Sequence, residues 1–415
     1  MLLTFSFKNF GPYRDETIFD MRAVRSYKEH EQNLRTVGNE QVLKTAAIFG
    51  ANASGKSQLV KAYGCFFRIV DESFRNQENS EGDGKPDLPL SERGNVLRKN
   101  YHPFLFSSDG QDEETEFEGT YSGPDGEYRY GFTYTAERIT SEWLYFTNEE
   151  TGRQSTVLER STKDMNTINL GYSVRSECRK YIGEIPDDVL ALSFFDSLTL
   201  TNKLFSHASD CVLSVLPVGG VMCEEWVHEL SMDYFTRSFE SDQGAGLVKF
   251  LNGVDVAITG FTVDRHKDHV QVLTHHKGPD GIDYTARLSI ESDGTLKLIA
   301  LYRYLKIVLE HDVALLIDEL DAELHPLLLH YILKMFQGDN AVGQLIFTAH
   351  DVTLLDRKYL RRDQIWLVDK DGSGVSSMHS LSEYKVRNDA SFGSSYLSGV
   401  FSGIPLLTRA AGVEE

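Results

Sequence analysis

The feature that most constrains this chain is a glycine-rich loop, FGANASGKSQL from Phe49 to Leu59, between an apolar run and a segment of helical periodicity. Gly50, four further residues and then the run Gly55–Ser57 have the spacing of a Walker A loop, which needs a buried strand before it and a helix after it. Glycines let backbone N–H groups turn inward around a phosphate, and the helix adds the positive end of its dipole. A simple glycine turn would not explain Lys56 and Ser57 at these offsets. The loop therefore predicts an α/β fold of the P-loop NTPase class.

Different residues of this loop are expected to bind different parts of a nucleotide. We expect Lys56 to reach the β- and γ-phosphates of ATP and Ser57 to bind Mg²⁺, the two cofactors that such a loop implies. Downstream, Leu59, Tyr63 and Val70 mark one apolar face, so the loop opens onto a packed helix. The predicted nucleotide-binding residues are Gly50, Ala51, Asn52, Ala53, Ser54, Gly55, Lys56, Ser57 and Gln58.

Composition places the chain among ordinary globular proteins. Its 415 residues are 41% hydrophobic and 25% charged, which is enough for two or three domains with cores of their own. The apolar runs are short, and the start MLLTFSFKNF lacks a basic segment followed by a long apolar one, so we expect no membrane contact. The cysteines form no CxxC pair, which favours neither disulfides nor a zinc site and agrees with a cytoplasmic location. They are Cys65, Cys178, Cys211 and Cys223.

The charge balance bears on the class of partner. A net charge of −20 at pH 7 disfavours broad, sequence-independent adhesion to DNA phosphates. A local basic groove is compatible with this charge, so nucleic acid stays open as a partner but is not the default one.

A second motif supplies the carboxylates that a Walker A loop needs. The run VALLIDELDAELHP contains an apolar, β-branched strand that ends in Asp318 and Glu319, the form of a Walker B strand in a buried parallel sheet. We expect Asp318 to act on Mg²⁺ through water, and Glu319 to orient or deprotonate the attacking water. A strand that ends in a solvated acidic turn is the alternative, but the Walker A loop independently requires these groups.

Further along the chain, the strand QLIFTAH ends in His350, where ATP-binding-cassette folds carry their switch histidine. A lone histidine at a strand end is more often structural, whereas beside both Walker motifs the catalytic interpretation is favoured. Leu320 and Asp321 occupy the position of a D-loop, directly after the Walker B pair.

A short Ser/Gly segment lies between the Walker motifs. In LSIESDGTLKL an alternating strand is expected to give way to Ser292 as the N-cap of a long helix. In cassette ATPases a signature of this kind grips the γ-phosphate bound to the opposite subunit, which gives Ser292 and Gly294 a role in trans and predicts a homodimer or larger oligomer. Simple helix capping is the alternative.

The stretch between Ser57 and Asp318 is far longer than a minimal nucleotide domain requires. Residues 76–100 are polar and rich in Gly, Pro and acidic side chains, which predicts a flexible insertion. The alternating runs TEFEGTY, GEYRYGFTY and SEWLYFTN predict an antiparallel β-meander whose aromatic residues belong to the core. We therefore divide the chain into an N-terminal half of an ATPase head (1–170), an inserted helical arm (171–250) and a C-terminal half of the head (251–415). The core aromatics are Tyr128, Tyr130, Phe132 and Tyr134.

Taken in order, these motifs resemble the cassette-like ATPases of prokaryotic defence loci, which are related to SMC, RecF and OLD proteins and include AbiL-type, RloA-type and PARIS AriA-type proteins. The resemblance covers nearly the whole chain. It rests on FSFKNFGPYRDE, GANASGKS, YRYGFTY, SDGTLKL, LLIDELDAELHP, QLIFTAHD and the tail KVRNDASFGSSYLSGVFSGIP. It implies an ABC-ATPase-like head with a mixed central sheet. It also implies that Phe10 and Tyr13 lie near the nucleotide and that Ser292 acts in trans.

The chain departs from this pattern in two respects. No glutamine stands out as a Q-loop residue, so that position stays unassigned. OLD nucleases carry a Toprim domain, whereas the sequence after His350 is too short for one, and we expect no nuclease in this chain. Asp369 and Asp371 in VDKDGSG form a DxD pair, but the turn residues around them favour a hairpin over a metal site.

Three function classes follow. The favoured one is an ATPase that senses infection by phage and controls a toxic effector or nuclease encoded nearby, in abortive infection, with a phage protein as a possible trigger. The alternative is a RecF/SMC-like DNA repair or clamp ATPase, which the charge disfavours. The third, an ATPase subunit of a membrane transporter, lacks the full signature and a reason for the long insertion.

Overall fold

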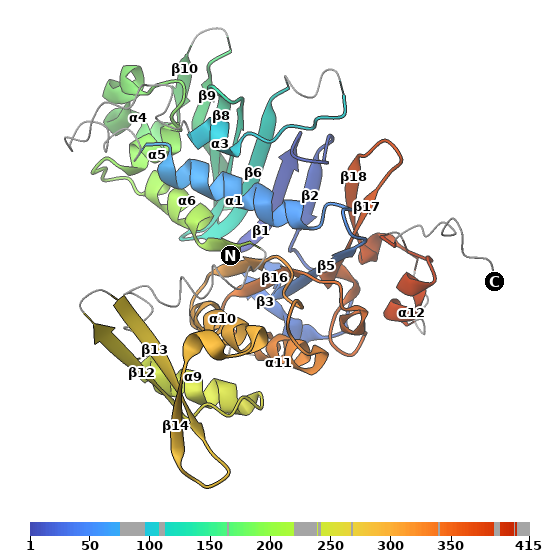
Figure 1. Cartoon of the computed structure of the whole chain (residues 1–415). Helices are drawn as coiled ribbons and strands as arrows, with labels where there is room; N and C mark the ends of the chain where they lie inside the picture. The colour runs from blue at the N-terminus through green and yellow to red at the C-terminus, as the bar shows by residue number, and fades with distance from the viewer. Residues whose placement is uncertain are drawn as a thin grey trace.

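The computed structural model of the chain is built around two large β-sheets, with two smaller sheets and helices between and below them (Figure 1). The structure describes residues 1–74, 96–107, 113–163, 166–219, 239, 242–266, 269–338, 341–385, 391–401 and 403–404. Most of the predicted flexible insertion lies outside these residues; its last part forms helix α3 (Val96–Asn100).

The six-stranded sheet carries the predicted motifs. Its order is β11 (Val215–Val218), β15 (Ala314–Ile317), β16 (Gln344–Thr348), β5 (Thr45–Gly50), β17 (Ile365–Lys370) and β18 (Ser376–Ser380). The first five strands are parallel, and β18 pairs antiparallel with β17. Parallel strands covered on both faces read as continuous apolar runs, as the sequences of β5 and β15 do. The predicted α/β class with a mixed central sheet is confirmed.

This sheet separates two hydrophobic cores, because successive side chains of a strand point to opposite faces. On β5, Ala46 and Ile48 belong to a cluster that includes the meander, here called the N-terminal core. Ala47 and Phe49 belong to a second cluster with the downstream helices, here called the C-terminal core. The strand before the glycine loop is therefore packed from both sides.

The seven-stranded sheet contains the predicted meander and is antiparallel throughout. Its order is β10 (Thr167–Leu170), β9 (Gln154–Ser161), β8 (Ile139–Asn148), β7 (Gly126–Tyr134), β6 (Thr115–Gly123), β1 (Leu2–Lys8) and β2 (Thr17–Asp20). The four aromatic residues of β7 are almost completely buried, as expected of core residues. The sheet therefore continues the chain's first hairpin into the predicted meander.

Helix α1 (Ser57–Glu72) runs along this sheet and presents its apolar face to it (Figure 1). The Phe66 ring lies 5.5 Å from that of Phe132, and the hydroxyl groups of Tyr63 and Tyr121 are 2.8 Å apart. The predicted burial of Leu59, Tyr63 and Val70 is confirmed.

The predicted helical segment is helical in its first part, but it also holds a strand that the sequence pattern missed. Helices α4 (Tyr172–Cys178), α5 (Ala191–Asp196) and α6 (Leu204–Leu213), with η2 (Arg179–Glu184), contribute side chains to the N-terminal core. The next residues form β11, which pairs with β15, the predicted Walker B strand. As far as it is described, the first part of this segment therefore packs in the N-terminal core and adds a strand to the six-stranded sheet. Of residues 220–241, only Phe239 lies within the described part of the chain.

A buried ion pair fixes α5 to the meander. The Arg160 guanidinium lies 3.7 Å from the Glu142 carboxylate, and neither side chain is exposed to solvent. Glu142 also accepts hydrogen bonds from the backbone N–H groups of Ala191 and Leu192 and from the Tyr130 hydroxyl. Burial raises the pKa of Glu142, while Arg160 and these donors lower it.

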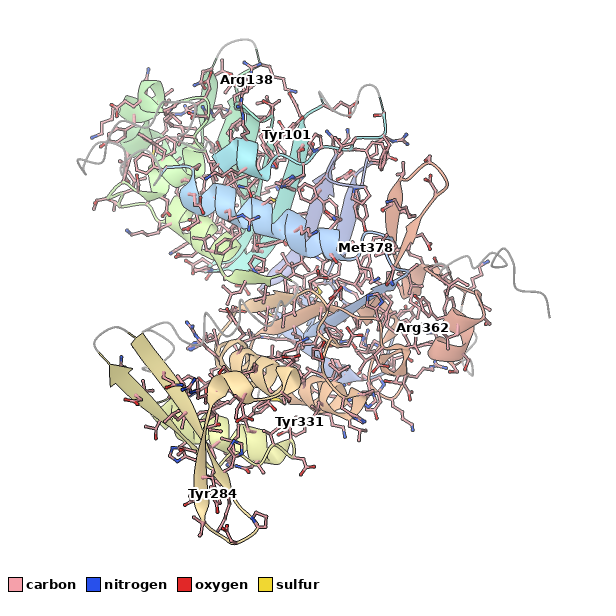
Figure 2. All side chains as sticks on the ribbon, viewed as in Figure 1. Tyr101, Arg138, Tyr284, Tyr331, Arg362 and Met378 are labelled. Atoms are coloured by element: carbon pink, nitrogen blue, oxygen red, sulfur yellow. The ribbon has the colours of Figure 1, made fainter. Side chains whose placement is uncertain are left out.

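The C-terminal half adds helices on the other face of the six-stranded sheet and a small sheet that extends away from it (Figure 1). The helices are α9 (Asp242–Gly253), α10 (Asp293–Glu310), α11 (Pro326–Phe336) and α12 (Phe392–Leu397). The small sheet consists of β12 (Gly260–His266), β13 (His269–Lys277) and β14 (Asp283–Arg287), and Tyr284 marks its outer strand (Figure 2). The strand expected to run up to Ser292 ends at Arg287 and is followed by the 3-10 turn η3 (Leu288–Ile290).

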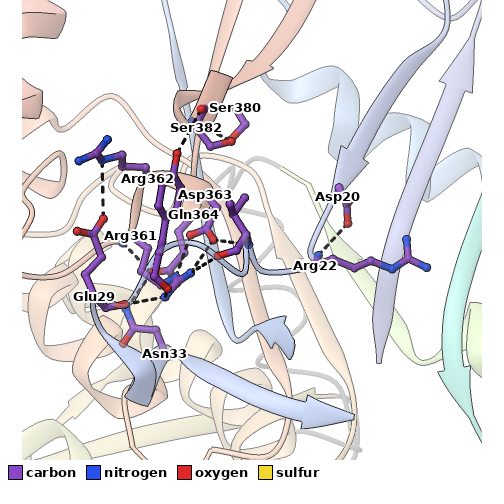
Figure 3. Close-up of polar contacts among 12 residues, drawn as sticks. Asp20, Arg22, Glu29, Asn33, Arg361, Arg362, Asp363, Gln364, Ser380 and Ser382 are labelled. Atoms are coloured by element: carbon purple, nitrogen blue, oxygen red, sulfur yellow. Dashed lines mark hydrogen bonds and ion pairs between the residues drawn. The ribbon is translucent and has the colours of Figure 1, made fainter. Parts of the chain in front are cut away.

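The loop after β2 is held to the sheet by a buried arginine (Figure 3). Arg361 is 0% exposed and donates hydrogen bonds to the Glu29 carbonyl (2.6 Å) and the Asp363 carboxylate (2.8 Å). Asn33 donates to Gln364, which in turn donates to the Thr45 carbonyl at the start of β5. The small hairpin of β3 (Leu34–Val37) and β4 (Glu40–Leu43) follows this loop. The cluster fixes the strand that leads into the glycine loop at its N-terminal end.

Three smaller predictions can be compared with the structure. Asp371 lies in the turn between β17 and β18, where its Oδ1 atom accepts from the N–H groups of Ser373 and Val375, so the predicted hairpin is confirmed. Cys65, Cys178 and Cys211 are buried and form no disulfide bond with one another, and Cys223 lies outside the described residues. Among the helices that the structure describes, none is long and apolar enough to cross a membrane.

Candidate functional site

The glycine loop joins β5 to α1 at the C-terminal end of the parallel strands, where open α/β sheets place their ligands. A Cβ at position 50 would lie 2.5 Å from the Val368 carbonyl oxygen and 2.7 Å from Ser54 Oγ, so only glycine fits there. Gly55 has a φ of +112°, which likewise requires glycine. The loop therefore closes tightly onto the neighbouring strand β17.

Lys56 lies inside this loop. Its ammonium group donates to the Gly50 carbonyl at 2.7 Å and to the Ala51 carbonyl at 2.9 Å. Burial lowers the pKa of Lys56, while the carboxylates of Asp318, Glu319 and Asp321 act in the opposite direction. The loop cation and the acidic residues after β15 thus share one electrostatic environment.

The acidic pair follows β15 directly. Asp318 is 7% exposed and accepts a 2.6 Å hydrogen bond from the Thr348 hydroxyl. Glu319 has a φ of +53°, a left-handed conformation that residues other than glycine seldom adopt and that is concentrated at functional sites. The Asp318 carboxylate is therefore bound at the end of β16, whereas Glu319 lines the cavity described next.

A cavity of about 980 Å³ opens beside the loop. Lys56, Ser57 and Gln58 line it on one side, and Glu319 and His350 also face it. Residues from three separate parts of the sequence are thus brought together at one opening. Its volume is within the range of small-molecule sites.

The predicted D-loop residue connects the acidic turn to the histidine. Asp321 Oδ2 accepts from the backbone N–H groups of His350 at 2.6 Å and Asp351 at 2.7 Å. His350 itself is exposed. The position of the histidine is therefore set by the same turn that carries Glu319.

The turn of the first hairpin, between β1 and β2, packs against the glycine loop. Phe10 and Tyr13 are almost completely buried, and the Tyr13 hydroxyl donates to the Gly55 carbonyl at 3.2 Å. Burial raises the pKa of Tyr13, which keeps its hydroxyl protonated. A Cβ on Gly11 would lie 2.8 Å from Gln58 Oε1, so this turn also packs against the start of α1.

Sequence reasoning missed one wall of the cavity. Residues 101–106, YHPFLF, follow α3 and line the opening through Tyr101, His102 and Leu105, among others; Figure 2 labels Tyr101. Burial, and then the charges of Arg68 and Lys61, lower the pKa of His102. This wall lies far along the chain from the glycine loop, beyond the long insertion. Its signal in the sequence would have been the apolar pair Leu105–Phe106, which is more than half exposed.

The predicted signature residues lie elsewhere on the surface. Ser292 caps α10, since its Oγ accepts from the Thr295 N–H at 3.2 Å, and it is exposed. A Cβ on Gly294 would lie 2.6 Å from the Glu323 carbonyl oxygen, so the helix start packs closely on the acidic turn. Neither residue lines the cavity of its own chain.

The residues present fit a nucleotide with its metal ion. Ser54 Oγ is buried without a hydrogen-bond partner, and α1 begins at the loop with its N-terminal N–H groups directed there. A phosphate would be held by the loop from Gly50 to Ser57, and Mg²⁺ by the Ser57 hydroxyl and the Asp318 carboxylate. The bound ion would neutralise phosphate charge that develops during transfer.

Comparisons with known proteins give one family match and similar solved structures. Residues 231–356 match the family described as "AAA domain, putative AbiEii toxin, Type IV TA system"; this range contains Ser292, Glu319 and His350 but not the glycine loop. Among solved structures, the chain is similar to the SMC head bound to the C-terminal winged-helix domain of ScpA (15% identity, TM-score 0.44, covering 92% of this chain and 99% of that chain). It is also similar to an SMC head domain from Thermotoga maritima (14% identity, TM-score 0.40, covering 91% of this chain and 98% of that chain). The comparison with curated proteins finds no match.

Proposed function

We propose that this chain binds and hydrolyses ATP with Mg²⁺. The observation that carries the proposal is the cavity in which Lys56 and Ser57 face Glu319 and His350. These are the residue types that P-loop ATPases use to hold phosphates, bind Mg²⁺ and direct a water molecule.

Each residue has a proposed role. Lys56 leaves its two loop carbonyls and neutralises phosphate charge, and Ser57 and Asp318 hold the metal ion. Glu319 orients or deprotonates the attacking water, and His350 contacts the phosphate that is released. General-base catalysis of this kind contributes about 10²–10⁴-fold to a rate.

Lys56→Ala tests the binding half of the proposal. We expect it to abolish ATP binding, because the loop loses the cation that faces the phosphates. Calorimetry with Mg²⁺ and ATP on the wild type and the variant measures this, with Lys99→Ala, an exposed lysine of α3 outside the cavity, as the control. Unchanged affinity in Lys56→Ala would contradict the proposed site, and so would a wild-type protein that releases no phosphate from ATP.

We also propose that the ATPase works as a homodimer or larger oligomer. Ser292 is exposed at the start of α10, an eighteen-residue helix, and lies outside the cavity of its own chain. A second subunit would bring its own nucleotide to this helix end, where the N–H groups and the dipole favour an anion.

For the biological role, we propose control of a toxic effector or nuclease in a cytoplasmic, prokaryotic anti-phage system of the abortive-infection kind. The description of the family that matches residues 231–356, with its reference to the AbiEii toxin, supports this choice. A RecF/SMC-like DNA clamp is the second candidate, and the net charge of −20 weighs against it. Phosphate release with and without duplex DNA separates the two, because a clamp would be stimulated by DNA and an effector-controlling ATPase would not.

A further inference from the structure

The turn after β15 is held by side chains from two other elements. The backbone N–H of Glu319 donates to Thr348 Oγ1 at 2.7 Å, and its carbonyl accepts from Lys297 Nζ at 2.9 Å. Both backbone polar groups of the proposed catalytic residue are thus bound by side chains. Strained backbone conformations such as that of Glu319 persist only where surrounding contacts hold them.

Thr348 connects Glu319 to the proposed metal ligand. It is the last residue of β16 and is 0% exposed. Its hydroxyl donates to Asp318 Oδ1 at 2.6 Å while it accepts from the Glu319 N–H. A hydroxyl group has one proton to donate, so the bond to Asp318 fixes the direction of the Thr348 O–H. A lone pair on the same oxygen remains to accept from the Glu319 N–H. Thr348 therefore orients one carboxylate and anchors the backbone of the next residue.

Lys297 approaches the same turn from the opposite side. It lies on α10, is 2% exposed, and also donates to the Ala322 carbonyl at 2.7 Å. A buried ammonium group is retained only where acceptors surround it, because desolvation is costly. Its acceptors here include two carbonyls of the turn that carries Glu319 and Asp321.

We propose that Thr348 and Lys297 are positioning residues for ATP hydrolysis, which hold Glu319 in its left-handed conformation and aim its carboxylate into the cavity. The inference rests on the proposed function, since it assigns roles within the same site. Neither residue lines the cavity, so neither touches the substrate; both act through the turn.

The first test compares Thr348→Val with Thr348→Ser. Valine keeps the shape but removes the hydroxyl, whereas serine keeps the hydroxyl. We expect Thr348→Val to lower kcat about tenfold to a hundredfold with ATP affinity almost unchanged, and Thr348→Ser to restore most of the rate. The control is Thr133→Val, which removes a buried hydroxyl paired at 2.7 Å with Thr140 in the meander and leaves kcat per folded molecule unchanged.

Lys297→Met gives an independent test, with Lys44→Met as its control. Lys44 is also buried and donates to backbone carbonyls, but it precedes β5 at the other end of the sheet. We expect Lys297→Met to lower kcat at unchanged ATP affinity and Lys44→Met to affect only the unfolding midpoint. Rates are compared per folded molecule, with the folded fraction taken from thermal unfolding.

A double-mutant cycle distinguishes positioning from a general loss of structure. If Thr348 acts mainly through Glu319, Thr348→Val slows hydrolysis far less in a Glu319→Gln background than in the wild type. Full additivity, or a wild-type kcat in Thr348→Val, overturns the inference and leaves the proposed function intact. A wild-type protein that binds no ATP overturns both.

Discussion

The Asp321 carboxylate accepts a 2.6 Å hydrogen bond from the backbone N–H of His350, two residues beyond the end of β16. The same oxygen accepts from Asp351. One acidic side chain in the turn after β15 therefore fixes where the histidine segment leaves the sheet.

We expect Asp321→Ala to release the His350 segment and lower hydrolysis by about tenfold or more, because a misplaced reacting group is costly in rate. ATP affinity should fall far less, since the glycine loop is untouched. Phosphate release and calorimetry on the same preparation measure both quantities. Asp321→Asn keeps an acceptor oxygen and should be milder; equal rates for Asp321→Ala and the wild type would remove this role from Asp321.

Glu319→Gln should bind ATP with ordinary affinity but hydrolyse it at a rate lower by about two orders of magnitude, because the amide cannot accept a proton from water. The left-handed backbone tolerates either side chain equally, so the folded structure should be preserved. Single-turnover phosphate release measures the rate, and size-exclusion chromatography with ATP shows whether a closed assembly accumulates. Near-normal turnover would exclude Glu319 as the base.

Mixing two inactive variants tests whether Ser292 acts in trans. Ser292→Arg should leave ATP binding to the isolated subunit intact but block hydrolysis and ATP-dependent association, since a bulky cation occupies the helix start. Lys56→Ala lacks its own site but retains a normal Ser292. A mixture of the two should regain roughly one working site per dimer. Continued inactivity despite demonstrated subunit exchange, or normal hydrolysis by Ser292→Arg as a monomer, would refute the dimeric arrangement.

Arg160→Met tests the buried ion pair with Glu142. Removing Arg160 leaves the buried Glu142 carboxylate without a charged partner, held only by its hydrogen bonds, so we expect a loss of roughly 3–5 kcal/mol in the free energy of unfolding at neutral pH. Arg129→Met is the control: its 2.9 Å ion pair with Glu118 is partly exposed, and its loss should cost about 0–1 kcal/mol.

The pH dependence of Arg160→Met follows from the same carboxylate. Burial already raises the pKa of Glu142 in the folded state, and loss of Arg160 raises it further. Because the folded state then binds the proton more tightly than the unfolded state, stability falls as the pH rises through the folded pKa. The destabilisation should therefore shrink as the pH is lowered toward the ordinary range of a carboxyl group. Urea unfolding at several pH values measures this; a pH-independent loss would contradict it.

The strands and the helix around the glycine loop could be predicted because their patterns are local. β5 and β15 are continuous apolar runs, and Gly50 and Gly55 stand where the backbone allows no other residue. The alternation of β7 likewise predicted which aromatic rings would be buried. In each of these cases, the physical requirement acts within one element.

Other features depend on contacts between distant segments and could not be read from spacing. Thr348 gives no signal in QLIFTAH, because its role arises only when β16 lies beside β15. β11 was missed because its residues, VLPV, are few and include a proline, which is tolerated here on an edge strand. The cavity wall at 101–106 was missed because the chain returns to the site only after a long insertion.

The alternation of β5 between two cores has a consequence for how the molecule unfolds. Ile48 packs with the meander and Phe49 with the downstream helices, so neighbouring residues report on different halves. If either the meander or the downstream helices unfolded, one face of the six-stranded sheet would lose its packing partner. Apolar side chains of β5, the strand that leads to Gly50, would then be exposed to water. The two halves should therefore melt as one cooperative unit although each has its own core, and amide hydrogen exchange along β5 should approach the rate of global unfolding.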